Sequence, residues 1–276
     1  MTQPLVVCVM LTRDRPEMAR RAIASFQSQN YERKRLYVLD SGKGMGAISA
    51  LPDRHPELGI VYHRTQAECK YTGRLRTIGD LRNYANEWVF RDGADLIAHW
   101  DDDDWSYPRR LEEQVALLQA SGKQCVGYRE LLFWDTRCEA CDPIDTMTGA
   151  IIHMQNCPPG EAWLYRNDDP RWVAGTSMLY TREAWEACPF DDAPHEDQRW
   201  WLKNAEKCLG QSSIDSEYLY DGATHPRGGQ HAPRMIAQIH TGGTEQIPRE
   251  MMHSGGGGVW RRAPEYDGLC ERTMKL

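Results

Sequence analysis

Apolar residues recur along the first half of the chain in two alternating patterns, one typical of buried strands and one of amphipathic helices. Leu5–Leu11 is a continuous apolar, β-branched run, which is typical of a parallel strand buried on both faces. Pro16 then opens a predicted helix whose apolar face carries Ala19, Ala22, Ile23 and Phe26. The alternation continues with predicted strands at Leu36–Leu39, Gly59–His63 and Ala94–Trp100, and with predicted helices over Leu81–Val89 and from Pro108 to Gly122.

Strands and helices that alternate in this way predict a doubly wound α/β sheet. In such sheets, ligands bind beyond the carboxyl ends of the strands. Three polar segments directly follow predicted strands: Thr12–Arg15, Asp40 and Asp101–Asp104. We therefore expect these segments to lie on one rim of the sheet.

The second half of the chain is less regular. Val173–Thr181 predicts a strand, and Glu183–Cys188 a short helix. A further helix is expected from near Glu196, with Trp201, Ala205 and Cys208 on one face. After Asp221 we expect mostly loop, including Gly255–Gly258, which suits a hinge or a disordered stretch.

Composition and charge narrow the class of protein. The 276 residues are 41% apolar and 26% charged, which is ordinary for a globular protein. A net charge of −7 argues against broad coating of nucleic acid, which requires a basic surface. No stretch approaches the roughly 20 apolar residues that span a bilayer, and the N-terminal apolar run lacks the preceding charge of a signal peptide. Nine scattered cysteines do not form a disulfide framework, so we expect a cytoplasmic location.

The run Asp101–Asp104 follows the apolar stretch Gly93–Trp100 and places four like charges beside a buried segment. Asp101 and Asp103 are alternate residues, so at a strand end both reach the same side and can face one cation. Carboxylate oxygens suit Mg²⁺ or Mn²⁺. Asp102 is expected to be solvated. The alternative is a solvated acidic loop or an adventitious calcium site.

Four stretches in the chain, taken together, resemble the family 2 glycosyltransferases, which adopt the GT-A nucleotide-sugar-binding fold. The aspartate run is similar to their Asp-x-Asp-Asp signature. Val7–Pro16 resembles the first strand and its nucleotide-facing loop, and Arg82-Asn83 the Arg-Asn pair before the metal strand. The fourth stretch, Gly175-Thr-Ser…Phe190-Asp191…Glu196-Asp197, resembles the acceptor-side loop and its Glu-Asp motif.

The resemblance covers roughly residues 5–205 and implies an α/β fold of the GT-A (Rossmann-like) type, a mixed sheet flanked by helices with an irregular C-terminal acceptor-side region. We expect one domain over residues 1–276. Residues 1–122 would form the nucleotide-sugar-binding half and residues 123–276 the acceptor-side half. The second half would contain a cysteine-containing insertion at about 134–160 and a loop-rich tail.

The resemblance also implies roles on the donor side. Thr12 and Arg13 would face the nucleotide, and Arg82 would bind phosphate or base. Asp40 would accept a hydrogen bond from the nucleobase; as an alternative, it only forms the turn in Asp40-Ser-Gly. Three members of the aspartate run would have further roles. Asp101 would contact the ribose or the metal, Asp103 would bind the metal, and Asp104 would contact the sugar.

On the acceptor side, the family places the catalytic base at the second residue of the Glu-Asp pair, which is Asp197, with Glu196 as its support. Acidic residues also occur at helix starts because the helix dipole favours them, which is the alternative interpretation. His240 resembles a late histidine that joins the metal shell in some GT-A enzymes, and His225 is its weaker rival.

The resemblance implies a metal-dependent, inverting transfer of a sugar, with Mn²⁺ or Mg²⁺, from a uridine diphosphate sugar to an acceptor hydroxyl. The acceptor would be a saccharide; a hydroxylated base in modified viral DNA is an alternative. A metal-dependent nucleotidyltransferase would carry a glycine-rich phosphate loop after the first strand, where Thr12–Pro16 has no glycine. A non-catalytic nucleotide- or carbohydrate-binding module would need no base at Asp197.

One further pattern is independent of the family. Cys138, Cys141, His153 and Cys157 have a spacing compatible with a small structural zinc site. Free thiols in a variable insertion are the alternative.

Overall fold

The structure, a computed structural model, describes residues 3–42, 59–66, 68, 74–137, 160–219, 231–240, 252 and 259–274. The chain divides into two compact units, of which the first comprises Met1–Arg129 with Asp169–Ser212 and the second Glu130–Asp168 with Ser213–Leu276. The predicted division at residue 122 stays a prediction. Cys138, Cys141, His153, Cys157, His225 and Gly255–Gly258 lie outside the described residues, and so do the hypotheses that rest on them.

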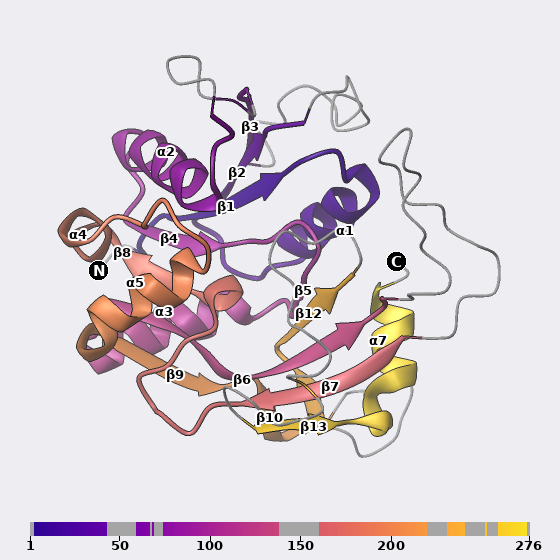
Figure 1. The fold of residues 1–276 in the computed structure, drawn as a ribbon. Helices are drawn as coiled ribbons and strands as arrows, with labels where there is room; N and C mark the ends of the chain where they lie inside the picture. The colour runs from indigo at the N-terminus through magenta and orange to yellow at the C-terminus, as the bar shows by residue number, and fades with distance from the viewer. Residues whose placement is uncertain are drawn as a thin grey trace. The chain divides into compact units, whose positions relative to one another are not determined.

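The first unit is built on a mixed sheet (Figure 1). Strands β3 (Ile60–Arg64), β2 (Lys34–Asp40), β1 (Val6–Thr12) and β4 (Leu96–His99) are parallel neighbours in this order. Strand β8 (Leu179–Thr181) is antiparallel to β4 and also pairs with Cys125 and Val126 at the start of β6 (Cys125–Asp135). A two-residue strand, β5 (Trp105–Ser106), follows the aspartate run.

Helices cover both faces of this sheet. Alternate β1 side chains point to opposite faces and therefore pack with different helices. Val6, Cys8 and Met10 pack with α1 (Pro16–Gln27) and α3 (Arg110–Ser121). Val7 and Val9 pack with α2 (Ile78–Arg91), α4 (Arg182–Ala187) and α5 (Glu196–Asn204). The predicted strands and helices of the first half are therefore confirmed, although α3 begins two residues after Pro108.

Two predicted elements of the second half differ from the structure. Of the predicted strand Val173–Thr181, only β8 is extended, because Gly175–Ser177 forms a 3₁₀-helix, η2. Helix α5 ends at Asn204, whose side-chain amide donates back to the carbonyl of Trp200 at 2.9 Å. Ala205 and Cys208 therefore lie beyond this helix, in η3 (Ala205–Lys207) and β9 (Cys208–Ser212).

The second unit contains a sheet in the order β13 (Val259–Arg262), β7 (Glu161–Arg166), β6 and β12 (Met235–Ile239). A separate ribbon pairs β10 (Ile214–Leu219) with β11 (His231–Pro233). Near the C-terminus, η4 (Pro264–Tyr266) leads into α7 (Asp267–Met274). The expectation of mostly loop after Asp221 is therefore wrong for the described residues. These strands are too short to show periodicity, and the partners of β12 and β13, which are β6 and β7, lie far away in the sequence.

The described cysteines, Cys8, Cys125, Cys188, Cys208 and Cys270, are all free thiols. Within the described parts of the chain, no helix has the length and apolar character that crossing a membrane requires.

Candidate functional site

The site lies in the first unit, where three adjacent parallel strands end on one rim. Thr12 at the end of β1 is the register partner of Asp40 at the end of β2. On the other side of β1, Val9 pairs with His99, and the aspartate run follows His99 after one residue. The predicted convergence of the three strand ends is confirmed.

Asp102 is the most deeply buried member of the aspartate run, with 1% of its side chain exposed. Thr12 Oγ1 donates to Asp102 Oδ2 at 2.7 Å, and Arg15 Nη2 lies 2.8 Å from Asp102 Oδ1. The expectation that Asp102 is solvated is wrong, because the chain turns after β4 and directs this carboxylate inward. Burial raises the pKa of Asp102, against the opposing effect of Arg15.

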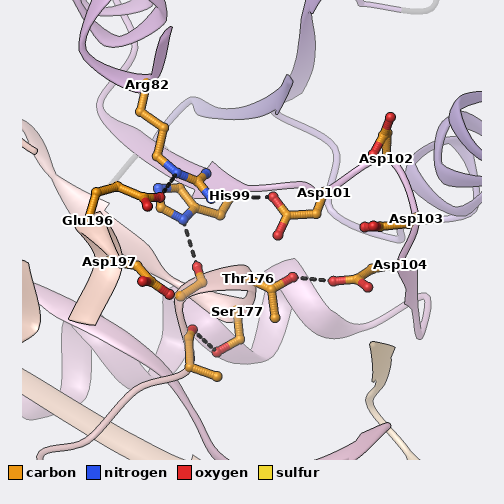
Figure 2. A network of polar contacts seen from close by, with 12 residues as sticks. Arg82, His99, Asp101, Asp102, Asp103, Asp104, Thr176, Ser177, Glu196 and Asp197 are labelled. Carbon is orange, nitrogen blue, oxygen red and sulfur yellow. Dashed lines mark hydrogen bonds and ion pairs between the residues drawn. The ribbon is translucent and has the colours of Figure 1, made fainter. Parts of the chain in front are cut away.

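The other three aspartates each have a polar partner, and Figure 2 shows those of Asp101 and Asp104. Arg15 Nη1 reaches Asp103 Oδ2 at 3.2 Å, so one guanidinium bridges Asp102 and Asp103. Arg82 Nη2 lies 3.5 Å from Asp101 Oδ1. Buried Asp104 accepts a hydrogen bond from Thr176 Oγ1 in η2. The run is thus a set of four different environments.

Asp40 is held in a turn by its own neighbours. Its Oδ1 accepts from the Gly42 backbone amide at 2.7 Å, and its Oδ2 accepts from Tyr62 Oη at 2.8 Å. The turn contact that the Asp-Ser-Gly sequence suggested is present. Exposed Arg13 donates from Nε to Ser41 Oγ in the same turn at 3.2 Å. The roles of Asp40 and Arg13 toward a nucleotide stay predictions.

Arg82 connects the aspartate run to the Glu196-Asp197 pair. Its Nε donates to Glu196 Oε1 at 2.9 Å, and both side chains are buried. Burial alone would lower the pKa of Arg82, but the charges of Asp101 and Glu196 raise it. Its Nη1 is buried without a hydrogen-bond partner among the described residues.

Asp197 stands in the first turn of α5 and packs directly on Gly175. A methyl group added at Gly175 would lie 1.7 Å from Asp197 Oδ2. Asp197 Oδ1 accepts from the Gln198 backbone amide at 2.7 Å. Burial, followed by the charge of Glu196, raises the pKa of Asp197 from 3.8 to about 6. A carboxylate with a pKa close to neutrality suits a general base.

Substitution Gly175→Ala tests this packing. We expect the new methyl group to displace the Asp197 carboxylate, because no space exists between them. A displacement of about 1 Å at a reacting group costs on the order of 10²-fold in rate. The kcat of transfer should fall by that amount, measured alongside thermal unfolding. The control Gly268→Ala in α7 meets only the end of Arg272, at 3.3 Å, and should change neither quantity. A fully active Gly175→Ala variant would contradict the packing.

Two buried residues that the sequence did not single out connect η2 to β4. His99 Nδ1 lies 2.6 Å from the Gly175 carbonyl oxygen, and burial holds the pKa of His99 well below its ordinary value. Arg110 Nη2 donates to the carbonyls of His99 and Thr176, at 2.9 and 3.2 Å. One residue separates His99 from the aspartate run, and Arg110 lies four residues before Gln114 on a helix. These spacings are the only local signals in the sequence that could identify His99 and Arg110.

Backbone strain also marks the site. Asp14 (φ 52°) and His195 (φ 58°) are the non-glycine residues with positive φ in the described part of the chain. Asp14 precedes Arg15, and His195 precedes Glu196. Residues held in this sparsely populated region cluster at functional sites.

The donor set at the strand ends is compatible with a divalent cation. The side chains of Asp101 and Asp103 are 28% and 15% exposed and offer hard oxygen ligands. Among the described residues, no three His, Cys, Asp or Glu side chains are grouped to hold a metal alone. This arrangement suits an ion that is bound by two carboxylates and whose coordination shell is completed by phosphate oxygens. His240 is buried at the end of β12 in the second unit, and its place in a metal shell stays a prediction.

Comparison with known proteins defines the class. Residues 7–130, a little under half of the chain, match the model of glycosyl transferase family 2. The resemblance inferred from the motifs is therefore confirmed over this segment. No curated protein matches the sequence.

Solved structures give the fold of nearly the whole chain. TarS from S. aureus is 10% identical with a TM-score of 0.53, over 85% of this chain and 36% of TarS. TarS 1–349 in complex with UDP-GlcNAc is 10% identical with a TM-score of 0.54, over 90% of this chain and 63% of that one. The mannosyltransferase PcManGT from Pyrobaculum calidifontis, in complex with GDP-Man and Mn²⁺, is 15% identical with a TM-score of 0.51. The match covers 98% of this chain and 68% of that one.

Identities this low establish the fold alone, and the predicted GT-A fold, with its mixed sheet flanked by helices, is confirmed. The chain spans less than two thirds of the TarS chains that it matches.

Proposed function

We propose that the chain is a metal-dependent, inverting glycosyltransferase that moves a sugar from a nucleotide sugar to an acceptor hydroxyl. The observation that carries the proposal is the joint placement of two acidic groups, the aspartate run after β4 and Asp197 at the start of α5. Arg82 contacts Asp101 of the first group and Glu196 beside Asp197. This single network of polar contacts supports a donor site and a base that act on one substrate pair.

In this mechanism Asp197 removes the proton of the acceptor hydroxyl while that oxygen attacks the anomeric carbon in line. Its raised pKa favours proton transfer near neutral pH. Glu196 is bonded to Arg82 and contributes negative charge beside the base. Asp104, which accepts a hydrogen bond from Thr176, would contact the donor sugar, and the nucleotide would be bound by Thr12, Arg13, Asp40 and Arg82.

Asp101 and Asp103 would hold the divalent ion, Mn²⁺ or Mg²⁺. When bound, such an ion neutralises the charge that develops on the departing diphosphate. Arg15 bridges Asp102 and Asp103 and keeps that side of the run compensated by a positive charge. The donor sugars in the related structures, UDP-GlcNAc and GDP-Man, support a nucleotide sugar as substrate class; we propose a uridine diphosphate sugar.

The acceptor we propose is a saccharide, and a hydroxylated DNA base is the second candidate. The net charge of −7 favours the saccharide, since a DNA groove needs basic side chains. A nucleotidyltransferase or a binding module is ranked lower, because neither requires a base of raised pKa at Asp197.

A screen of nucleotide sugars with Mn²⁺, read as donor hydrolysis and as binding by calorimetry, tests the proposal. We expect one donor class to bind with metal and to be hydrolysed slowly. Asp103→Ala should lower metal-dependent donor binding at least tenfold, because a direct ligand is lost. The control Asp168→Ala removes an exposed carboxylate of the second unit and should bind as the wild type does. If no donor binds and Asp103→Ala leaves metal binding unchanged, the proposal is wrong.

A further inference from the structure

We propose that His99 is a positioning residue that fixes the Gly175 peptide, and through it the carboxylate of Asp197, relative to the aspartates that follow β4. The inference rests on the proposed function, since it assigns to His99 the alignment of the base with the donor site. His99 itself stands behind the site and is 1% exposed.

The hydrogen bonds of His99 define one tautomer. The Gly175 carbonyl oxygen is only an acceptor, so Nδ1, at 2.6 Å, carries the ring proton. Nε2 is then the acceptor and faces Tyr180 Oη at 3.3 Å. The side-chain amide of Asn86 contacts the same Tyr180 hydroxyl at 2.9 Å. The far side of the imidazole therefore faces the Tyr180 hydroxyl of β8, and its proton points at η2.

Gly175 passes this anchoring to Asp197 by direct contact. The Cα of Gly175 lies so close to the Asp197 carboxylate that no Cβ fits between them. The carboxylate thus rests on a peptide whose carbonyl is bonded to His99. A shift of the Gly175 peptide would move the surface on which the base rests.

Two more contacts tie η2 to the end of β4. Arg110 Nη2 donates to the carbonyls of both His99 and Thr176. Thr176 Oγ1 donates to Asp104 in the aspartate run. Figure 2 shows His99 pointing from the strand that precedes the aspartates toward the η2 loop beside Asp197. The Gly175 carbonyl also accepts from the Met178 backbone amide at 3.3 Å. The side-chain contact from His99 ties this peptide, on which Asp197 rests, to β4, whereas Thr176 holds Asp104.

The pair of variants His99→Asn and His99→Leu separates the hydrogen bond from the packing of the ring. Both residues are of similar size and leave a similar cavity, so both should unfold at similar temperatures. The Asn amide nitrogen lies close to the position of Nδ1 and can still donate to the Gly175 carbonyl, whereas Leu cannot. We expect kcat of His99→Asn to stay within about tenfold of wild type and that of His99→Leu to fall by on the order of 10²-fold. The donor KM should be unchanged in both.

Equal kcat values for the two variants would overturn the positioning role, as would a loss that appears in the donor KM. The ¹⁵N chemical shifts of the His99 ring provide a readout that requires no substrate. We expect the Nδ1–H tautomer in the wild type, and the Nε2–H tautomer would overturn the inference. A wild type that transfers no sugar contradicts the proposed function, whereas an active wild type with indistinguishable variants contradicts only the role of His99.

Discussion

Asp197→Asn should abolish sugar transfer while it raises the stability of the protein. The amide cannot accept the hydroxyl proton, and loss of a general base costs on the order of 10²–10⁴-fold in kcat. Donor binding should persist, because Asp197 belongs to the acceptor side of the site. The wild-type kcat should fall as the pH drops below about 6, where Asp197 becomes protonated.

The gain in stability follows from the direction of the pKa shift. The folded protein raises the pKa of Asp197 from 3.8 to about 6, so it favours the protonated form and loses stability as the pH rises through this interval. A shift of about two units corresponds to at most about 3 kcal/mol. Removing a negative charge from the first turn of α5 opposes this by roughly 0.3–1 kcal/mol. The effect of burial therefore exceeds that of the helix dipole, and we expect the free energy of unfolding of Asp197→Asn to rise by about 1–2 kcal/mol at pH 7.

Urea unfolding of wild type and Asp197→Asn at pH 4 and pH 7 measures this gain, which should appear only at pH 7. Asp169→Asn is the matched control. The hydrogen bond from Arg171 lowers the pKa of Asp169, so this substitution should slightly destabilise the protein at pH 7 and leave transfer intact. A destabilised but fully active Asp197→Asn variant would remove Asp197 from the role of base.

The parts of the site that the sequence predicted are those set by strand position. Thr12, Asp40 and the aspartate run each follow a buried strand, and parallel strands that end on one rim bring such residues together whatever the details of the loops. The fold of the first unit was predictable for the same reason, because its strands and helices carry long periodic runs.

The missed parts depend on tertiary contacts that leave no local pattern. Arg110 and His99 contact η2, which lies 66 and 76 residues away in the sequence. The sequence does not predict the burial of Asp102, because strand alternation stops at His99, where β4 ends and the chain turns. The apolar pattern around Gly175 predicts a strand, whereas the structure has a 3₁₀-helix there, because a short apolar segment shows no difference between a strand and a turn.

The ion pair of Arg82 and Glu196 should show a large coupling energy in a double-mutant cycle. Both groups are buried and 2.9 Å apart. Arg82→Met leaves a buried carboxylate without its cation, and Glu196→Leu leaves a buried guanidinium, so each single change should cost about 3–5 kcal/mol. The double variant should lose much less than the sum, because an apolar pair replaces both charges. Urea unfolding measures all four proteins.

The exposed pair Arg182 and Glu186 is the control cycle, because its atoms lie 2.7 Å apart on α4 while its side chains are 52% and 48% exposed. Its coupling should be only about 0.3–0.5 kcal/mol. Equal couplings for the two pairs would show that burial does not set the strength of the Arg82–Glu196 contact.

Activity of the double variant then separates stability from function. Arg82 also reaches Asp101, so a protein whose fold is restored by the Met–Leu pair still lacks the cation beside the donor aspartates. It also lacks the Glu196 charge that helps to raise the pKa of Asp197. We therefore expect a folded double variant with transfer reduced at least as far as in Arg82→Met. Recovery of transfer together with stability would assign Arg82 to the fold alone.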